Sequence, residues 1–153
     1  MALKQYKPVT SSQRGLVLVD RKDVYKGKPH KKLTAGMSNS GGRNNYGHLT
    51  ARRKGGGHKK KYRLIDFKRN IIDMNATVVR IEYDPNRSSL IALLKYENND
   101  ISYIIAPQNL KTGDKIVSSD NADIKEGNCL KIKNIPTDTL IHNIELKPGK
   151  GGQ

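Results

Sequence analysis

The sequence predicts a mainly β protein in which a basic N-terminal arm precedes a small barrel or sandwich. The 153 residues carry 29 Lys and Arg against 14 Asp and Glu, a formal net charge of +15, and only 35% of them are apolar. The charge is uneven: residues 1–69 hold 19 Lys and Arg and three acidic residues, whereas residues 70–153 hold 10 and 11. Alternating apolar residues and regularly spaced turn residues fill the second part, as in short strands. This length excludes a large multidomain enzyme.

The basic arm, residues 1–60, is too poor in apolar residues to fold by burial alone. Leu, Ile, Val, Phe and Met number 14 in residues 1–69 and 24 in residues 70–153. Ordering the backbone costs roughly 1–2 kcal/mol per residue, so such a segment is extended or disordered by itself. Its charge indicates a polyanionic partner, such as nucleic acid or an acidic membrane. We expect that partner to order the arm and to satisfy many of its backbone polar groups.

Five short antiparallel strands are expected in residues 61–126, at 62–68, 76–84, 89–96, 101–106 and 116–117. The second alternates between two faces, with Val79 and Ile81 on one and Val78 and Arg80 on the other. The third is nearly all apolar, which is typical of a strand covered on both faces. Asp84-Pro85-Asn86-Arg87 supplies the turn between them. A five-stranded OB-fold is one well-populated solution for this pattern.

Residues 127–153 predict a further strand pair, at 130–135 and 139–146, on either side of Pro136. This pattern is typical of the start of a second barrel. Two strands alone are only marginally stable in water, so we expect something else to cover them.

The densest cationic segment lies at 52–63, where seven of twelve residues are Lys or Arg around three glycines. Glycines let backbone N–H groups approach phosphates closely while the flanking cations neutralise them, which favours nucleic-acid binding. The upstream segment 38–47 adds Arg, Asn and Tyr that suit base edges, 2′-hydroxyls and stacking. The alternatives are a flexible basic tail, a nuclear-localisation patch or an ordinary polar loop. His58 stands where a nucleotide-binding P-loop needs Lys and then Ser or Thr.

No residue pattern predicts catalysis, a metal site or a cofactor. The histidines lack metal-ligand spacing, and they are His30, His48, His58 and His142. Cys129 is the single cysteine and has no evident activating partner. The carboxylates are more simply explained as strand-end, turn or ion-pair groups, and those considered are Asp66, Asp73, Glu82 and Asp84. No stretch reaches the roughly 20 apolar residues of a membrane span, and no secretory signal is evident, so neither membrane binding nor export is expected.

Four cationic residues of the strand region have two interpretations. Either they extend the basic surface of the arm onto the barrel, which we favour, or they are ordinary solvated charges: Lys68, Arg69, Arg80 and Arg87.

Several uncommon sequence strings, in order along nearly the whole chain, resemble one protein family. They are SGGRNN (40–45), GGGHK (55–59), YRLIDFKR (62–69), IEYDPNRS (81–88), NIP (134–136) and IHNIELKPGKGGQ (141–153). Together they are similar to the N-terminal half of the bacterial type of large-subunit ribosomal protein 2.

The resemblance implies an extended arm (1–60), an OB-fold barrel (61–126) and the start of an SH3-like barrel (127–153). It also implies a non-enzymatic protein that binds large-subunit rRNA near the peptidyl-transferase region, contacts neighbouring ribosomal proteins, and supports subunit assembly and association. The RNA contacts that it implies are Arg43, Asn44, Arg52, Arg53, Gly55, Gly56, Gly57, His58, Lys59, Tyr62, Arg63, Lys68, Arg69 and Arg87.

In that family the second barrel continues beyond KPGKGGQ and is followed by a basic extension. The resemblance therefore implies a second polypeptide that supplies the C-terminal half. Split members of the family occur in mitochondria, and richness in Asn, Ile and Lys suits an AT-rich genome, so a mitochondrial ribosome is the location expected. The alternatives are a bacterial cytoplasmic ribosome and an engineered truncation.

Two other functions compete with this interpretation. A free-standing OB-fold protein that coats single strands would present aromatic platforms on its barrel, and this chain has seven Tyr, one Phe and no Trp. A nuclease or RNA-modifying enzyme would need Asp66, Asp84 or His58 for its chemistry.

Overall fold

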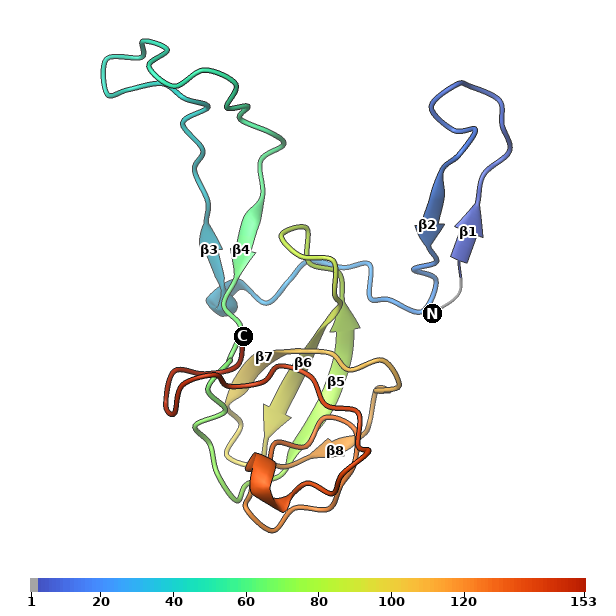
Figure 1. Cartoon of the computed structure of the whole chain (residues 1–153), viewed down its shortest axis with the longest axis vertical. Helices are drawn as coiled ribbons and strands as arrows, with labels where there is room; N and C mark the ends of the chain where they lie inside the picture. The colour runs from blue at the N-terminus through green and yellow to red at the C-terminus, as the bar shows by residue number, and fades with distance from the viewer. Residues whose placement is uncertain (1–2) are drawn as a thin grey trace.

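The computed structural model describes residues 3–153 and contains one four-stranded sheet and two separate hairpins (Figure 1). The strands are β1 (Leu3–Gln5), β2 (Val17–Val19), β3 (Thr34–Gly36), β4 (Lys61–Arg63), β5 (Ala76–Glu82), β6 (Ile91–Tyr96), β7 (Ile101–Ile105) and β8 (Lys115–Ile116). Two 3-10 turns are η1 (Lys31–Leu33) and η2 (Ile132–Asn134). The prediction of a mainly β protein is confirmed.

The four-stranded sheet is antiparallel, with the order β7-β6-β5-β8. β6 lies at its centre, and all but one of its residues are buried. The predicted strand with both faces covered is therefore confirmed. The short turns at residues 84–90 and 97–100 join β5 to β6 and β6 to β7, as their Asp, Pro and Asn residues predict.

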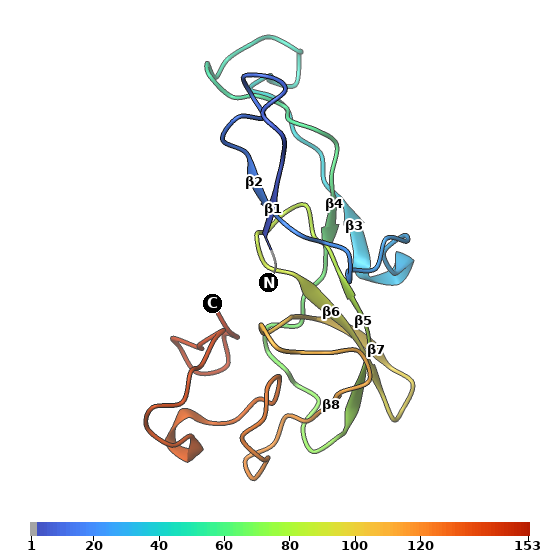
Figure 2. The same cartoon turned by 90° about the vertical axis from the view of Figure 1, so that its right-hand side faces the viewer.

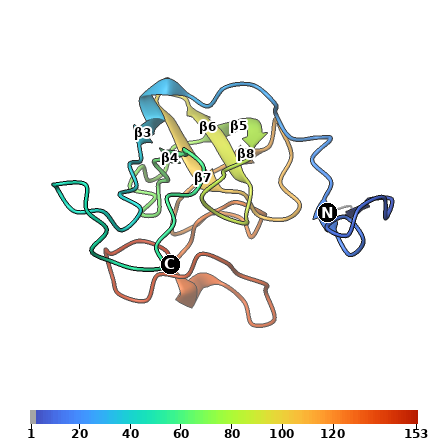
Figure 3. The same ribbon diagram turned by 90° about the horizontal axis from the view of Figure 1, so that it is seen from above.

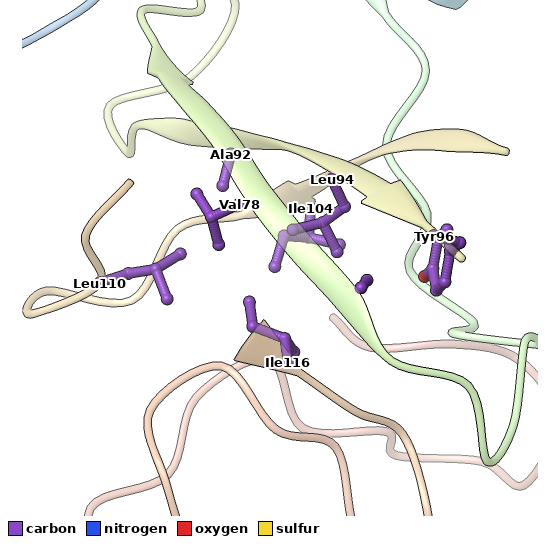
Figure 4. Packing of buried hydrophobic residues seen from close by; sticks show 8 residues of the cluster. Val78, Ala92, Leu94, Tyr96, Ile104, Leu110 and Ile116 are labelled. Carbon is purple, nitrogen blue, oxygen red and sulfur yellow. The ribbon is translucent and has the colours of Figure 1, made fainter. Parts of the chain in front are cut away.

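The core lies on both faces of this sheet. On one face, Leu94 packs with residues of all four strands and of the following loop (Figure 4). The buried members of this cluster are Ala76, Val78, Ala92, Leu94, Tyr96, Ile104, Leu110 and Ile116. On the other face, Ile91, Leu93 and Tyr103 form a second cluster, against which Leu33 of η1 packs. The end of the arm thus covers part of the sheet.

A β-bulge changes how β5 uses its two faces. The pairing register with β6 shifts between Val78 and Arg80, which breaks the strict alternation along the strand. Val78 is buried, whereas Val79 is 47% exposed, and Glu82 is buried. Beyond the bulge, Ile81 lies on the face of Val78, whereas Glu82 is buried on the opposite face beside Tyr103, and the apolar Val79 faces solvent.

The predicted strand at 62–68 is corrected by the structure. Residues 61–63 form β4, which pairs with β3 of the arm and not with the large sheet. Beyond it, only Ile65 bridges to Tyr103 of β7. Arg69 has a φ of 53°, in the left-handed region, and this turn ends the extended run. The sheet therefore has four paired strands where five were expected.

The arm is folded into two hairpins. β1 pairs with β2, and β3 pairs with β4 in the register Thr34↔Arg63. Figures 1 and 2 show both hairpins rising from the same end of the sheet, and Figure 3 shows β1 and β2 standing to one side of it. Strand pairing thus satisfies some of the backbone N–H and C=O groups of the arm, in place of the RNA and water expected from the sequence.

Residues 130–146 contain no strand, so the predicted strand pair is corrected to an irregular segment with the single turn η2. Asp138 and Asn143 have positive φ angles of 67° and 55°, which interrupt any extended run. Leu140 is 101% exposed and Leu146 is 73% exposed. An apolar pattern without a covering partner gains nothing from pairing two strands.

Candidate nucleic-acid interface

The loop between β3 and β4, residues 37–60, is here called the tip loop, and Gly42 organises its fold. The Gly42 carbonyl accepts hydrogen bonds from the Thr50 and Ala51 amides, at 3.0 and 3.1 Å. Gly42 is buried and has a φ of 79°, and a Cβ at this position would collide with the Ala51 carbonyl oxygen. Glycine is required here because both the space and the backbone conformation exclude a side chain.

Asn44 closes a smaller turn inside the tip loop. Its Oδ1 accepts hydrogen bonds from the amides of Tyr46 (3.0 Å) and His48 (2.9 Å). These contacts leave the Tyr46 ring 79% exposed. Asn44 therefore shapes the loop that presents a stacking surface, as short polar side chains do in turns.

The cations of the tip loop are exposed, and Arg43 also donates from Nη1 to the Gly41 carbonyl. Arg43, Arg52 and Arg53 are exposed, as are His58 and Lys59. None of the ion pairs among residues 3–153 involves this loop. No Asp or Glu occurs between residues 24 and 65. The loop therefore has a concentrated positive charge that no carboxylate of the loop neutralises.

The glycines of the GGGHK string are sterically free. A Cβ added at Gly55 or Gly56 would meet no atom within 4 Å, and the same holds at Gly57, where φ is 63°. Internal packing therefore does not require glycine at 55 or 56. The backbone at these glycines is therefore open to a close approach by another molecule.

An open groove of about 650 Å³, here called the cationic groove, lies at the base of this hairpin. Two segments far apart in sequence line it, because η1 and β3 lie beside β4. Its lining residues are Lys28, Pro29, Lys31, Thr34, His58, Lys59, Lys60, Lys61, Arg63 and Pro85. Six of the ten are Lys or Arg, and none is acidic.

Tyr62 and Arg87 lie beside the groove, next to a buried ion pair. The Arg87 Nε donates to Asp84 Oδ2 at 2.7 Å, and Asp84 is fully buried. The Arg87 guanidinium lies 5.9 Å from the ring centres of both Tyr62 and Phe67, within the range of a cation–π interaction. Arg87 thus holds the 84–87 turn in place and supports Tyr62.

The side chains of Lys68 and Arg69 differ in their hydrogen-bond partners. Lys68 is exposed, and its side chain has no polar partner among the contacts of residues 3–153. The Arg69 side chain donates from Nε to Ser118 Oγ at 3.0 Å and from Nη2 to the Gly127 carbonyl at 3.3 Å. Arg69 therefore ties the 66–69 turn to the loops that follow β8.

A buried polar cluster, here called the arm joint, attaches the arm to the sheet. The Tyr103 hydroxyl donates to Glu82, 3.0 Å from both carboxylate oxygens, and accepts from the His30 amide at 2.9 Å. Arg80 Nε donates to Glu82 Oε1 at 2.7 Å, and the Tyr25 ring lies 4.2 Å from the Arg80 guanidinium. These contacts fix residues 25–30 on the outer face of β5 and β7.

The titration of the arm joint follows from its burial. Desolvation raises the pKa of Tyr103, so its hydroxyl remains a donor. Burial opposes the charge of Arg80, but the hydrogen bond and the attraction from Glu82 outweigh it and raise the pKa of Arg80. Arg80 therefore keeps its positive charge inside this cluster.

Internal hydrogen bonds engage three of the four strand-region cations that we expect to extend the basic surface of the arm. Arg69, Arg80 and Arg87 each donate to partners inside the protein, and Lys68 alone of the four is exposed without such a partner among residues 3–153. Sequence reasoning also missed Lys28, Lys31 and Lys60 of the groove. Their density was visible, but strand pairing brings them together.

The groups considered for catalysis have structural partners. Asp66 Oδ1 accepts from the Arg69 amide at 2.9 Å, and Asp84 accepts from Asn86 and Arg87. Cys129 is exposed and lies in a backbone bridge with Ser118. Within residues 3–153, no three His, Cys, Asp or Glu residues gather as a metal site would require. Over the same residues, no helix has the length and apolar character needed to cross a membrane.

The geometry defines a class of protein: a small β domain that presents polycationic loops on a projecting hairpin. Residues 30–118 match the sequence profile described as "Ribosomal Proteins L2, RNA binding N-terminal domain". The chain therefore belongs to the L2 family of ribosomal proteins. The matched range begins at His30 of the arm joint and contains the tip loop, the sheet and all of the groove lining except Lys28 and Pro29.

Individual relatives agree with the profile. Over its whole length, the chain is 61% identical to the large ribosomal subunit protein uL2 of Rickettsia canadensis, 60% to that of Ruegeria pomeroyi and 58% to that of Parvibaculum lavamentivorans. It spans about 55% of the length of these curated relatives. The predicted resemblance to an N-terminal half is confirmed. The relatives are bacterial, and they give no support to the mitochondrial location.

Proposed function

We propose that the chain is a structural component of the large ribosomal subunit that binds large-subunit rRNA through the tip loop and the residues around its base. The observation that carries this proposal is the tip loop itself, which concentrates exposed cations in a stretch without any carboxylate. Phosphates neutralise such a charge, and the released counterions drive binding. The binding requires no chemical step by the protein.

Different parts of the hairpin make different contacts in this proposal. Arg52, Arg53 and Lys59 contact phosphates, which position the protein without reading sequence. The open backbone at Gly55 and Gly56 lets RNA approach closely, and Tyr46 stacks on an unpaired base. The proposed RNA-contact residues are Arg43, Asn44, Arg52, Arg53, Gly55, Gly56, Gly57, His58, Lys59, Tyr62, Arg63, Lys68, Arg69 and Arg87.

Charge removal at the tip tests this proposal. In the tip variant, Arg52, Arg53 and Lys54 are each replaced by Gln, which removes three exposed charges. Because each neutralised phosphate contributes roughly 0.7–0.9 to the slope of log affinity against log salt, the slope for large-subunit rRNA should fall by about 2. Filter binding of the full chain at several salt concentrations measures it.

A control variant removes the same number of charges far from the tip. Lys111, Lys115 and Lys133 are exposed and form no ion pair within residues 3–153. Replacing all three with Gln should leave the slope nearly unchanged. Equal losses in the tip and control variants would show that net charge alone, and not the tip loop, determines binding.

The place in the ribosome is the finer part of the proposal. We propose that the hairpin reaches rRNA near the peptidyl-transferase region and that its binding supports subunit assembly and association. The tip loop lies far along a projecting hairpin (Figure 1), which suits insertion between RNA helices. Photocrosslinking from position 46, followed by sequencing of the attached rRNA, tests this. Cross-links confined to RNA remote from that region would contradict it.

We propose the division 1–60, 61–126 and 127–153 for the arm, an OB-fold barrel and the start of an SH3-like barrel. In this proposal, a further polypeptide segment, from a second chain, covers the exposed apolar residues Leu140 and Leu146. The greater length of the relatives supports it. Co-purification from the native source should recover large-subunit rRNA and that chain, and the same experiment on ribosomes from isolated organelles and from cytoplasm determines the location.

Activity assays separate this proposal from the enzyme alternative. The triple variant with Ala at Asp66, Asp84 and His58 should leave RNA turnover at the background level of the unaltered chain. Turnover by the unaltered chain that this variant abolishes would establish a nuclease. Tight binding to polypyrimidine single strands, in preference to folded rRNA, would instead favour a single-strand coating protein.

A further inference from the structure

Arg63 is the unusual residue of the cationic groove. It is only 9% exposed, and its Nη1 donates to the Lys61 carbonyl at 2.7 Å. Its Nε is buried and has no hydrogen-bond partner. No carboxylate within residues 3–153 lies at ion-pair distance from it. A buried guanidinium without a counter-charge is costly, and proteins usually pair such a group.

The surroundings of Arg63 determine what could pair with it. The groove wall adds Lys28, Lys31 and Lys60, and it contains no acidic residue. Apart from Thr34 and His58, the polar residues of its lining are all Lys or Arg. Thr34 is the register partner of Arg63 in the β3–β4 pair. Such a lining suits an oxyanion, and the planar guanidinium matches phosphate geometry in a bidentate contact.

The groove is built into the fold and is not a chance gathering of mobile side chains. β3 and β4 hold its two walls together, and the Leu64 amide donates to the Leu33 carbonyl at 3.0 Å just below. The Asn86 Nδ2 donates to the Lys61 carbonyl at 2.8 Å, which fixes the same carbonyl that Arg63 binds. The site is thus preorganised before any anion arrives, which reduces the entropic cost of binding.

We infer that the cationic groove binds a phosphodiester group of the RNA backbone, with Arg63 as its central ligand and Lys28, Lys31 and Lys60 around it. The inference rests on the proposed function, because it takes the anion to be part of RNA. The lining offers no base-reading amide and no aromatic ring except His58. The groove therefore positions the hairpin root on the RNA backbone, and it shares only His58, Lys59 and Lys60 with the tip loop.

The first test uses exposed lysines of the groove, whose replacement we expect to leave the fold intact. In the groove variant, Lys28, Lys31 and Lys60 are replaced by Gln in the full chain. The slope of log affinity for large-subunit rRNA against log salt should fall by about 2, as each lost phosphate contact removes roughly 0.7–0.9. The control variant at positions 111, 115 and 133 should leave the slope nearly unchanged.

The second test addresses Arg63 itself. Arg63→Lys keeps the charge but removes the buried Nε–H and the planar fork, so a bidentate contact is lost. We expect about a tenfold loss of rRNA affinity, with the circular dichroism spectrum and melting temperature close to those of the unaltered chain. Full affinity in a folded Arg63→Lys variant would overturn the role of Arg63 as the central ligand.

A titration with inorganic phosphate tests whether the groove binds the RNA backbone or a free anion. Titration of the unaltered chain, followed by the NMR signal of Arg63 Nε–H, should show only weak saturation, and large-subunit rRNA should shift the same signal. Tight phosphate binding together with full rRNA affinity in the groove variant would mean that the groove holds a free phosphate, which overturns the inference.

The two proposals fail in different ways. Absence of a salt-dependent rRNA affinity in the unaltered chain would contradict the proposed function. A normal affinity that falls in the tip variant and stays unchanged in the groove variant would contradict this inference alone.

Discussion

Large apolar side chains are mostly buried in the four-stranded sheet, whereas those of the β1–β2 hairpin in the arm are exposed. In the sheet, Leu94 is 0% exposed and packs in a cluster drawn from four strands. In the β1–β2 hairpin, Leu18 is 43% exposed and Val17 is 49% exposed. Apolar burial holds the sheet together, whereas backbone pairing and a few anchoring contacts hold the arm. The region that supplies stability is therefore distinct from the region that supplies positive charge.

Removal of a core side chain is the strongest way to expose this difference. Leu94→Ala should lower the free energy of unfolding by about 2–5 kcal/mol, because it loses transfer free energy and leaves a cavity. Leu18→Ala, a leucine deletion in the arm, should change it by less than about 0.5 kcal/mol. Urea denaturation of the full chain measures both. Comparable losses would mean that the arm belongs to the same cooperative core.

The arm joint is the place where the two regions depend on each other. Tyr103→Phe removes the hydroxyl that serves both Glu82 and the His30 amide. The unpaired buried groups should cost about 1–3 kcal/mol. Amide hydrogen exchange should quicken in residues 25–34 more than in β6. Tyr46→Phe, at an exposed ring in the arm, is the matched control and should leave stability and exchange unchanged.

Two glycines in the tip loop separate internal structure from RNA contact. Gly42→Ala should strain the loop by roughly 1–2 kcal/mol, because the position has a positive φ and no space for Cβ. The Thr50 and Ala51 amides should then lose exchange protection. Gly56→Ala should leave these amides protected and weaken rRNA binding only. If Gly56→Ala binds rRNA as well as the unaltered chain, no close approach occurs there.

The smallest expected effect concerns His142. Desolvation and, after it, the charge of Arg69 lower the pKa of His142 below its ordinary value of 6.5. As the pH falls, His142 is therefore protonated in the unfolded chain before it is protonated in the folded chain. Its contribution to the free energy of unfolding is complete above pH 6.5 and declines as the pH falls below that value. His142→Gln should flatten this part of the pH dependence of unfolding. An identical decline in the variant would assign it to other groups.

The sequence predicted those elements whose stabilising contacts are local or purely apolar. β6 was recognisable because both its faces are apolar, and the turn at 84–87 was recognisable from its Asp, Pro and Asn residues. The pattern of burial along β5 was not recognisable. A bulge near Val78 changes its register, and Glu82 is buried because it binds Tyr103 of β7. A period-two pattern contains no information about bulges.

The sequence predicted which residue types make up the candidate site, but it did not predict how the fold brings them together. Exposed Arg52 and Arg53 agree with the expectation from charge density. Arg69 and Arg87 have internal partners that depend on loops distant in sequence. The groove joins residues 28–31 to residues 58–63 through the β3–β4 pairing, and charged segments show no apolar period from which that pairing could be inferred.

Hydrogen exchange of the full chain, with and without large-subunit rRNA, tests the division between the two regions most directly. We predict that rRNA increases protection in the tip loop and around Arg63, while the already protected amides of β5, β6 and β7 change little. Protection that appears across the exposed positions of the sheet, with residues 37–63 unchanged, would contradict the account.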